Sequence, residues 1–180
     1  SLVAPIVKFV PEGEIEPTAG NYESRAYFRK QLSDYYGALQ DYAKAYELSP
    51  KNEILLKQAE IRALQGDTDA ALRDIMTVLQ NDPTYGVTYT IESLGITGKE
   101  EPAKKSQIII GTYTKLIDKL PSVPLLYVRR ASIRSSAGDY QGALQDYDRA
   151  IAKDPKNVEL YSSRADVKVN LKDMKGALQD

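Results

Sequence analysis

The sequence predicts an all-α protein built as a solenoid of stacked helix pairs, and two repeating features carry this prediction. The phrase Gly-Ala-Leu-Gln-Asp occurs three times, beginning at Gly37, Gly142 and Gly176. Prolines recur with a similar period, separated by 33, 38 and 34 residues, at Pro50, Pro83, Pro121 and Pro155. Such self-similarity is typical of architectures in which each repeat is one supersecondary unit that buries its apolar face against its neighbours.

The residues before each proline predict the second helix of a unit. Small, aromatic or aliphatic side chains stand there at positions i, i+4 and i+7. The three sets are Ala38, Tyr42 and Ala45; Ala71, Ile75 and Val78; and Ala143, Tyr147 and Ala150. This spacing places each set on one face of a helix, and the leading alanine lets that helix approach its partner closely.

A first helix is expected before each of these segments. It is marked by Tyr22, Arg25, Ala26 and Arg29; by Tyr127, Arg130, Ala131 and Arg134; by Tyr161, Arg164, Ala165 and Lys168; and, more loosely, by Leu55, Gln58, Ala59 and Arg62. Gly66-Asp67 or Gly138-Asp139 follows, replaced by Ser33-Asp34 in the first unit. Glycine can end one helix in a left-handed conformation, and the aspartate can cap the next. We expect Pro50–Asn52 and Pro155–Asn157 to end a pair and to supply an asparagine cap.

The pattern over Tyr127–Pro155 resembles the tetratricopeptide repeat family, whose unit is a helix–turn–helix of about 34 residues. The resemblance covers Ala19 to Asp180. It implies a right-handed α-solenoid whose first helices line a concave groove. The predicted organisation is an extended arm over 1–18 and a repeat domain over 19–180, with units at about 19–52, 53–85, 86–123 (degenerate), 124–157 and 158–180 (incomplete).

Both ends of the sequence bear on this organisation. The chain opens with Ser1 rather than methionine, and the last unit stops inside its second helix at Asp180. A solenoid is expected to end on a polar cap, because an unpaired repeat leaves its apolar face in water. We therefore expect that the natural protein continues or that another molecule supplies the missing helix.

The third unit departs from the family pattern, because its proline spacing is longer and it has no Gly-Asp turn. Gly86–Ser93 predicts a short first helix, weakened by β-branched residues, and Gly95–Gly98 predicts a loop. Pro102, after two glutamates, predicts the start of a long second helix that reaches Leu120.

Apolar residues on that long helix fall on more than one face. We expect Ile109, Tyr113 and Leu116 to form its inner stripe. Ile108 and Ile110 add apolar surface elsewhere. They either pack under the longer loop or form a contact patch for a partner or a second copy.

The segment Leu2–Pro17 lies outside the repeats. Its apolar residues, Val3, Ile6, Val7, Phe9 and Val10, are interspersed with prolines, which disfavours a helix. We expect an extended arm that lies against the first repeat. Alternatively, the arm occupies a groove or joins a neighbouring molecule, as a bound peptide would.

Composition restricts the chemistry available to the protein. With 24 Lys and Arg against 25 Asp and Glu, the chain lacks the basic excess that phosphate neutralisation requires. It has no cysteine and no histidine, so disulfides, the commonest general base and the commonest metal ligand are all absent. No stretch approaches the roughly 20 apolar residues of a membrane span. We predict no cofactor, no metal, no nucleic-acid partner and no membrane insertion, while the compartment stays open.

Residues that could suggest a catalytic or ion site have structural explanations. Nucleophile-elbow, phosphate-loop and zinc-ligand motifs do not occur. Asp67-Thr68-Asp69 resembles the opening of a calcium loop, but the later glycine and glutamate are missing and the position is that of a helix cap. Three arginines could bind anions, yet each unit also carries an aspartate in its second helix. We therefore predict ties between Arg25 and Asp41, Arg130 and Asp146, and Arg164 and Asp180.

The resemblance also implies where a partner would bind. In the family, ligand-facing residues flank the repeated ones on the first helices. The corresponding residues here are Glu23, Tyr27, Lys30, Leu56, Glu60, Val128, Ser132, Ser135, Ser162 and Asp166. Chaperone-binding members hold a C-terminal carboxylate with a Lys/Asn/Arg clamp. Here Glu23 and Tyr27, and Val128 and Ser132, stand in matching places, which argues against that ligand class.

The sequence therefore predicts a non-catalytic protein–protein interaction scaffold that binds a peptide or partner segment in the groove. One alternative is a structural module that self-associates through the N-terminal arm or the incomplete C-terminal repeat. Another is a regulatory domain of a longer multidomain protein. The identity of the partner is left open.

Overall fold

The computed structural model describes residues 16–96 and 99–180, and these residues fold entirely into helices and connecting turns. The all-α prediction is confirmed. The predicted arm over residues 1–15 and the loop residues 97–98 lie outside the described residues. The helices are α1 Ala19–Gln31, α2 Tyr35–Leu48, α3 Asn52–Leu64, α4 Thr68–Asn81, α5 Thr88–Ser93, α6 Pro102–Lys119, α7 Pro124–Ser136, α8 Tyr140–Lys153, α9 Val158–Asn170 and α10 Met174–Gln179.

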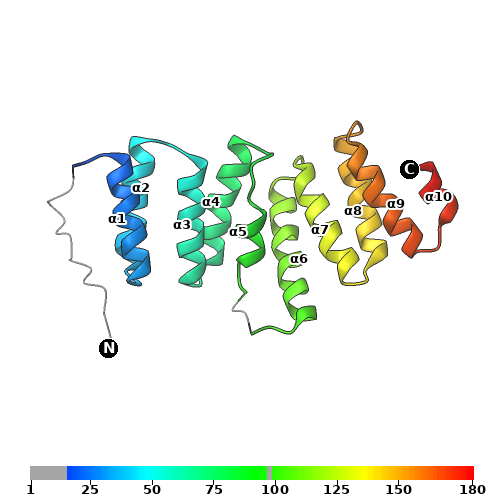
Figure 1. The fold of residues 1–180 in the computed structure, drawn as a ribbon, viewed down its shortest axis with the longest axis horizontal. Helices are drawn as coiled ribbons and strands as arrows, with labels where there is room; N and C mark the ends of the chain where they lie inside the picture. The colour runs from blue at the N-terminus through cyan, green and yellow to red at the C-terminus, as the bar shows by residue number, and fades with distance from the viewer. Residues whose placement is uncertain (1–15, 97–98) are drawn as a thin grey trace, which may run out of the picture.

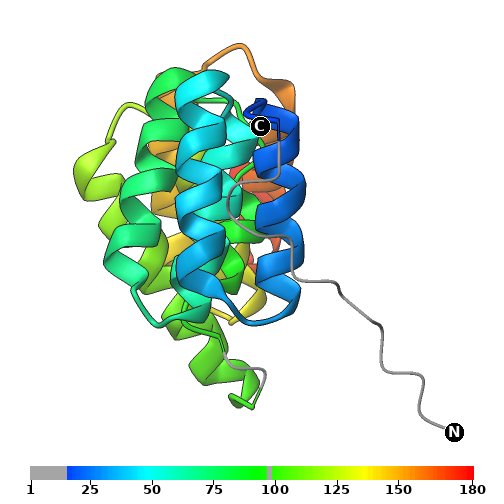
Figure 2. The ribbon, with the colours of Figure 1, turned by 90° about the vertical axis from the view of Figure 1, so that its left-hand side faces the viewer.

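The helices form pairs that stack in chain order into an elongated row (Figure 1). Figure 2 looks along this row from the α1 end, with the later pairs behind the first pair. Each odd-numbered helix is the first of its pair and each even-numbered helix the second. Every unit therefore contacts mainly its immediate neighbours, which is the arrangement of an α-solenoid.

Aspartates begin the second helices, as the sequence predicts. Asp34, Asp67, Asp139 and Asp173 each accept a hydrogen bond from the backbone N–H three residues later. Satisfying this otherwise unpaired N–H stabilises a helix by about 1 kcal/mol. For Asp67 the acceptor role towards Ala70 confirms a cap in place of a calcium ligand.

The preceding turn needs one residue with positive φ. Gly66 and Gly138 fill this position at φ 81° and 85°. Ser33 and Lys172 adopt similar values of 61° and 64°, although side chains disfavour them. The turn geometry is thus kept even where glycine is absent.

The predicted asparagine caps are confirmed at one of two positions. Asn157 precedes α9 and its side chain accepts from the N–H of Glu159. Asn52 is instead the first residue of α3, after Lys51, and makes no capping hydrogen bond. Its side-chain oxygen accepts from the Asn81 amide at 3.1 Å, so Asn52 links α3 to the end of α4.

Buried apolar side chains fill the space within and between pairs. One cluster extends from α3 to α9, a second lies between α1, α2 and α3, and a third between α7, α8 and α9. The leading alanines Ala38, Ala71 and Ala143 are all 0% exposed, so no larger side chain fits there without displacement.

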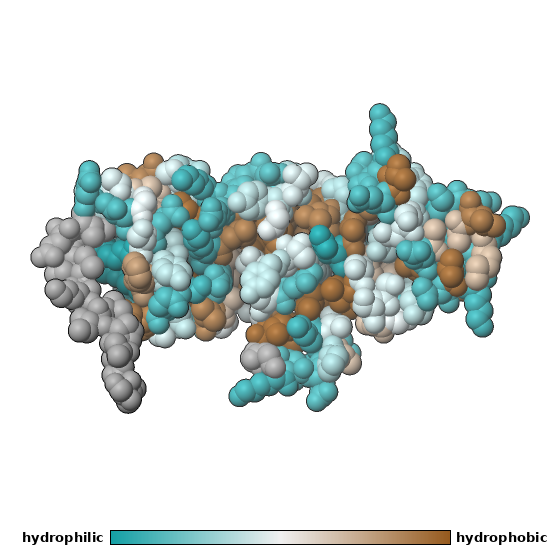
Figure 3. Space-filling model, viewed as in Figure 1, coloured by the Kyte–Doolittle hydropathy of each residue, from teal (hydrophilic) through white to brown (hydrophobic). Residues whose placement is uncertain are grey.

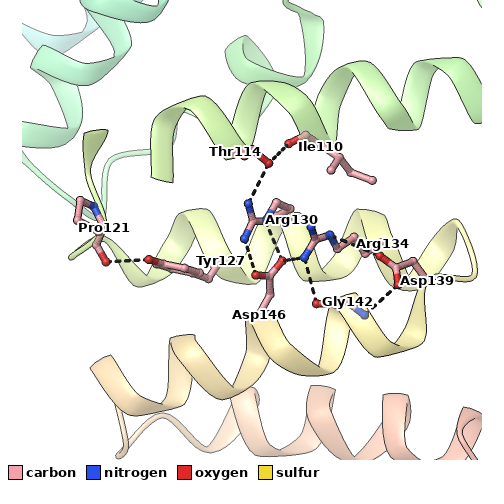
Figure 4. A network of polar contacts seen from close by, with 9 residues as sticks. All are labelled: Ile110, Thr114, Pro121, Tyr127, Arg130, Arg134, Asp139, Gly142 and Asp146. Carbon is pink, nitrogen blue, oxygen red and sulfur yellow. Dashed lines mark hydrogen bonds and ion pairs between the residues drawn. The ribbon is translucent and has the colours of Figure 1, made fainter. Parts of the chain in front are cut away.

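The predicted Arg–Asp ties are present at all three places. Arg130 meets Asp146 through two hydrogen bonds of 2.8 and 2.7 Å (Figure 4). Arg25 and Asp41 have the same two distances, and Arg164 bonds both carboxylate oxygens of Asp180. Charge-assisted paired bonds of this kind fix the geometry between two helices.

The third unit is irregular in the way that its sequence predicts. Its first helix, α5, is short and begins at Thr88, two residues later than expected. Its second helix, α6, begins at Pro102 and ends at Lys119, one residue before Leu120. Apolar surface gathers around α5 and α6 in Figure 3, near the middle of the molecule.

The apolar residues of α6 divide as expected between core and periphery. Ile109, Tyr113 and Leu116 are at most 5% exposed, which confirms the inner stripe. Ile108 and Ile110 are half-buried. A side chain added at Gly95 would lie 3.5 Å from Ile108, so Ile108 packs under the loop after α5. In the described part of the chain, no helix has the length and apolarity to cross a membrane.

Candidate functional site

A pocket lies where the first two pairs meet, on the first helices. It encloses about 460 Å³ and is lined by Gly20, Glu23, Ser24, Tyr27, Phe28, Tyr42 and Lys57. Two predicted groove residues, Glu23 and Tyr27, belong to it. We call it the α1–α3 pocket, because α1 and α3 supply its charged residues and its exposed aromatic rim.

The charges of the α1–α3 pocket are paired across the two helices. The Lys57 ammonium lies 3.1 Å from a carboxylate oxygen of Glu23 on α1 and 3.1 Å from one of Glu53 on its own helix. Burial alone would lower the pKa of Lys57, but the hydrogen bonds to Glu53 and Glu23 outweigh it and raise the pKa. Lys57 is therefore a stable cation between two carboxylates.

A second ion pair extends this pattern along the same two helices. Lys30 on α1 lies 2.6 Å from Glu60 on α3. Three of the predicted groove residues, Glu23, Lys30 and Glu60, are thus brought into one row of alternating charges. Both pairs are half-buried and open to the pocket side of the helices, so a partner's charged groups could exchange with them.

Tyr42 from α2 forms part of the pocket wall. The residue as a whole is only 2% exposed. Burial raises the pKa of this phenol, opposed in part by Lys57. A neutral hydroxyl at a pocket wall can donate to or accept from a peptide group.

Sequence reasoning placed Tyr42 in the core and passed over Lys57. Tyr42 was assigned to the core because it stands in the apolar stripe of α2, and that pattern does not show that the residue also lines a pocket. Lys57 directly follows the predicted groove residue Leu56. A search for charges opposite Glu23 one repeat later would have found it.

Two predicted groove residues serve the core. Leu56 on α3 is half-buried and packs against the largest cluster. Val128 on α7 is also half-buried and contacts two clusters. Their side chains support the first helices and offer only part of their surface to a partner.

The predicted groove residues of the C-terminal half have smaller side chains than those on α1 and α3. Ser132, Ser162 and Asp166 are exposed, and Ser135 is half-buried. Ser132 and Ser135 lie on α7, while Ser162 and Asp166 lie on α9. These small polar residues leave room above the helices.

Arg129 is a charged residue in this half that was not among the predicted groove residues. It is exposed on α7. The pKa of Tyr147 is raised, mainly by burial and further by Asp166. A hydrogen bond with Ser163 and the charge of Arg129 oppose this increase. Burial and Glu92 raise the pKa of Tyr113, and Arg129 lowers it. Arg129 therefore lies within electrostatic reach of two buried phenols.

A second pocket lies between two second helices, α4 and α6. It encloses about 340 Å³ and is lined by Asp69, Leu72, Arg73, Met76, Lys115, Leu116, Asp118 and Lys119. Lys115 approaches Asp69 at 3.7 Å across it. The residues of this pocket include none of the predicted groove residues.

The described ranges contain no cluster of side chains suited to a metal ion. Among residues 16–96 and 99–180, no group of three or more Asp, Glu, Cys or His side chains is placed to hold a metal ion. The buried carboxylates Asp41 and Asp146 are occupied by arginines. What the geometry offers is a polar surface with an aromatic rim on the first helices.

The fold and this surface define a helical-repeat solenoid protein. Within that class, the family model described as a TPR repeat matches residues 132–171. The match covers the end of α7, the Gly138-Asp139 turn and all of α8 and α9. Residues 132–171 therefore carry a tetratricopeptide repeat.

Solved structures with a similar fold are related to the chain at low sequence identity. A MamA protein is 18% identical, with 89% of this chain and 86% of that chain covered and a TM-score of 0.49. MamA from Desulfovibrio magneticus RS-1, residue 41 to the end, is 15% identical, with 89% of each chain covered and a TM-score of 0.49. The thermophilic TPR protein TTC0263 of Thermus thermophilus is 18% identical, with 89% and 87% covered and a TM-score of 0.47. No curated protein matches the chain.

Proposed function

We propose that the protein is a non-catalytic interaction scaffold that binds an extended peptide or partner segment along its first helices. The observation that carries this proposal is the α1–α3 pocket, where the paired charges of Glu23 and Lys57 lie beside exposed aromatic rings and Tyr42. The repeat family supports the general role, because its members commonly serve as protein-interaction scaffolds.

The pocket favours a segment of mixed chemistry. The rings of Tyr27 and Phe28 meet edge to face at 5.6 Å and offer an apolar rim. Lys57 and Glu23 can exchange their mutual contact for charges of the ligand, while Tyr42 can bond a peptide group. A segment with an apolar anchor beside a charged residue would satisfy all three features.

The C-terminal half of the groove would extend the binding surface. Ser132 and Ser135 on α7 leave space for a chain, and Arg129 with Asp166 can pair with charges along it. A bound segment that reached from α1 to α9 would run along the five first helices α1, α3, α5, α7 and α9. Such length would add specificity without requiring a deep pocket.

Selection of peptides from a random display library on the purified chain tests the proposal. The dissociation constant of an enriched peptide is then measured by calorimetry for wild type and for Tyr27→Ala. We expect binding to weaken by about tenfold, because a central aromatic anchor typically contributes more than 1 kcal/mol. Tyr36→Ala is the matched control, since Tyr36 is 72% exposed on α2 and outside the pocket.

A double substitution tests the extension of the groove. Ser132→Arg with Ser135→Arg should abolish binding of peptides that run along α7, whereas peptides held only at α1 and α3 should be unaffected. If no enriched peptide responds to either the Tyr27 or the serine substitutions, the groove proposal is wrong. Concentration-dependent dimers in sedimentation, with no enriched peptide, would favour the self-assembly alternative instead.

A further inference from the structure

The pocket between α4 and α6 contains more apolar surface than the repeat pattern requires. We call this cavity of about 340 Å³ the α4–α6 pocket. Leu72 and Leu116 belong to its lining and also to the core, at 7% and 1% exposed. Met76, the third apolar residue of the lining, is only half-buried.

Met76 distinguishes this pocket from the corresponding places in other units. It directly follows Ile75 of the apolar stripe of α4. The residues at the same place in α2, α6 and α8 are Ala43, Thr114 and Asp148. A small or polar side chain therefore satisfies the repeat fold here. A methionine, in contrast, offers a flexible apolar group that adapts its shape to a ligand.

An ion pair crosses the α4–α6 pocket. The Lys115 ammonium on α6 lies 3.7 Å from a carboxylate oxygen of Asp69 on α4. Their side chains are 64% and 78% exposed, and such exposed pairs contribute little stability. A ligand can therefore separate the two side chains at small cost.

The other charges of the lining are mostly positive. Arg73 and Lys119 are exposed, and neither forms an ion pair with another residue of the described part of the chain. Asp118 is the one further carboxylate of the lining. Positive charge therefore exceeds negative charge around the apolar residues, which favours an acidic ligand.

We propose that the α4–α6 pocket binds a segment of a partner protein in which one large apolar side chain stands next to Asp or Glu. The apolar side chain packs against Leu72, Met76 and Leu116, and the carboxylate pairs with Arg73 or Lys119. A cavity of about 340 Å³ lies near the lower limit of the roughly 300–1,000 Å³ of ligand pockets. It therefore suits a single anchoring side chain.

This site is separate from the groove of the proposed function. The second helices α4 and α6 line it, and it shares no residue with the α1–α3 pocket. The inference therefore does not depend on the proposed function. It adds a second binding site, so that the protein can hold two partners or two parts of one partner at the same time.

The methionines of the chain allow a direct readout at this pocket, because the sequence has only two. Met76 lines the pocket, and Met174 is 56% exposed on α10. Both are labelled with ¹³C at the methyl group in the full chain. Their NMR signals are assigned with Met76→Ala and Met174→Ala. Alanine at position 76 matches Ala43 of α2, so Met76→Ala keeps the repeat pattern.

The probe is a peptide selected from a random display library. The selection uses the full chain with its groove closed by Tyr27→Ala, Ser132→Arg and Ser135→Arg. The most enriched peptide is synthesised and added to the labelled wild-type protein. We expect it to carry an apolar residue beside Asp or Glu, to shift the Met76 methyl signal and to leave the Met174 signal unchanged.

Dissociation constants then identify the residues that hold the peptide. We expect the Kd to rise about tenfold in Met76→Ala and in Arg73→Glu, as for the central contacts of an interface. Arg149→Glu is the matched control, because Arg149 is an exposed arginine of α8 outside the pocket, and its Kd should equal that of wild type.

Several results would overturn the proposal. One is that no peptide is enriched, and another is that the enriched peptide leaves the Met76 signal unmoved. A basic peptide that shifts this signal would also contradict it, because Asp69 and Asp118 would then select the ligand. A Met76 signal that shifts when the protein alone is concentrated would assign the pocket to a second copy of the chain.

Discussion

The α7–α8 pair and the α5–α6 pair lie side by side, but different interactions hold them together. In α7–α8, Asp146 is 0% exposed and binds both Arg130 and Arg134, the latter at 2.9 Å (Figure 4). In α6, Thr112 occupies the position that corresponds to Asp146, one residue before the tyrosine of the stripe. Its hydroxyl donates only to the Ile108 carbonyl of its own helix.

Apolar burial takes over where the ion pairs are missing. Ile91 and Leu94, from the short first helix and its end, are both 0% exposed against the core. The Tyr113 hydroxyl reaches Glu92 at 3.2 Å, which is a polar link between α5 and α6. The comparison shows that the pair geometry of the solenoid can be maintained by directed charge pairs or by an aliphatic core.

Asp146→Ala should have the largest effect on stability. It leaves the Arg130 guanidinium, 4% exposed, without its carboxylate. Removal of one partner of a buried pair typically costs about 3–5 kcal/mol. Urea unfolding of the full chain measures the change, and Thr112→Ala is the control, expected to cost less than about 1 kcal/mol. Similar losses for the two variants would show that the charge pairs do not distinguish the two pairs of helices.

Ile91→Ala should come next, because it removes a fully buried side chain from the six-residue helix α5. Such truncations cost about 2–5 kcal/mol, and a short helix can relax into part of the cavity, so the lower half of that range is expected. Hydrogen exchange should then show faster exchange in α5 than in α7. Unchanged exchange in α5 would mean that Glu92 and Tyr113, rather than aliphatic burial, hold this helix in place.

The features that the sequence predicted well depend on local rules. Spacing along one or two helices is enough to predict three of them. These are the aspartate caps of the second helices, the proline at the start of α6, and the arginines that stand sixteen residues before their aspartates. The failure of Asn52 as a cap was missed because its side-chain oxygen accepts from Asn81 on another helix. The start of α5 at Thr88 was placed two residues too early.

The site was less predictable because it spans repeats. Glu23 and Tyr27 were identified through the family resemblance, but the pairing of Lys57 with Glu23 depends on how one pair stacks on the next. The same holds for Tyr42, which belongs to a core cluster and also lines the pocket. The spacing of apolar residues along the sequence predicts which face of a helix is buried. It does not predict which polar atoms of neighbouring units come into contact.

The smallest predicted effect concerns the ion pair between α3 and α4, which differs from those of the other helix pairs. Here Gln58 replaces the first arginine, and Asp74 is held by Arg62 alone. Burial raises the pKa of Asp74 above its ordinary value of 3.8, and the Arg62 hydrogen bond offsets this only in part. The folded protein therefore binds the proton more tightly than the unfolded chain does. Stability from this group is fully present below 3.8 and is lost as the pH rises through the higher folded pKa.

Comparison with Asp74→Asn isolates this pH dependence, because asparagine does not titrate. As the pH is lowered from neutrality towards 3.8, the free energy of unfolding of wild type should increase relative to that of Asp74→Asn. Urea unfolding of both proteins at a series of pH values measures the difference, and Asp69→Asn, on an exposed residue of the same helix, is the control. A difference that instead falls with decreasing pH would show that Arg62 outweighs burial. The single arginine of this pair would then hold its aspartate as an anion, and α3–α4 would belong with α7–α8 in the comparison.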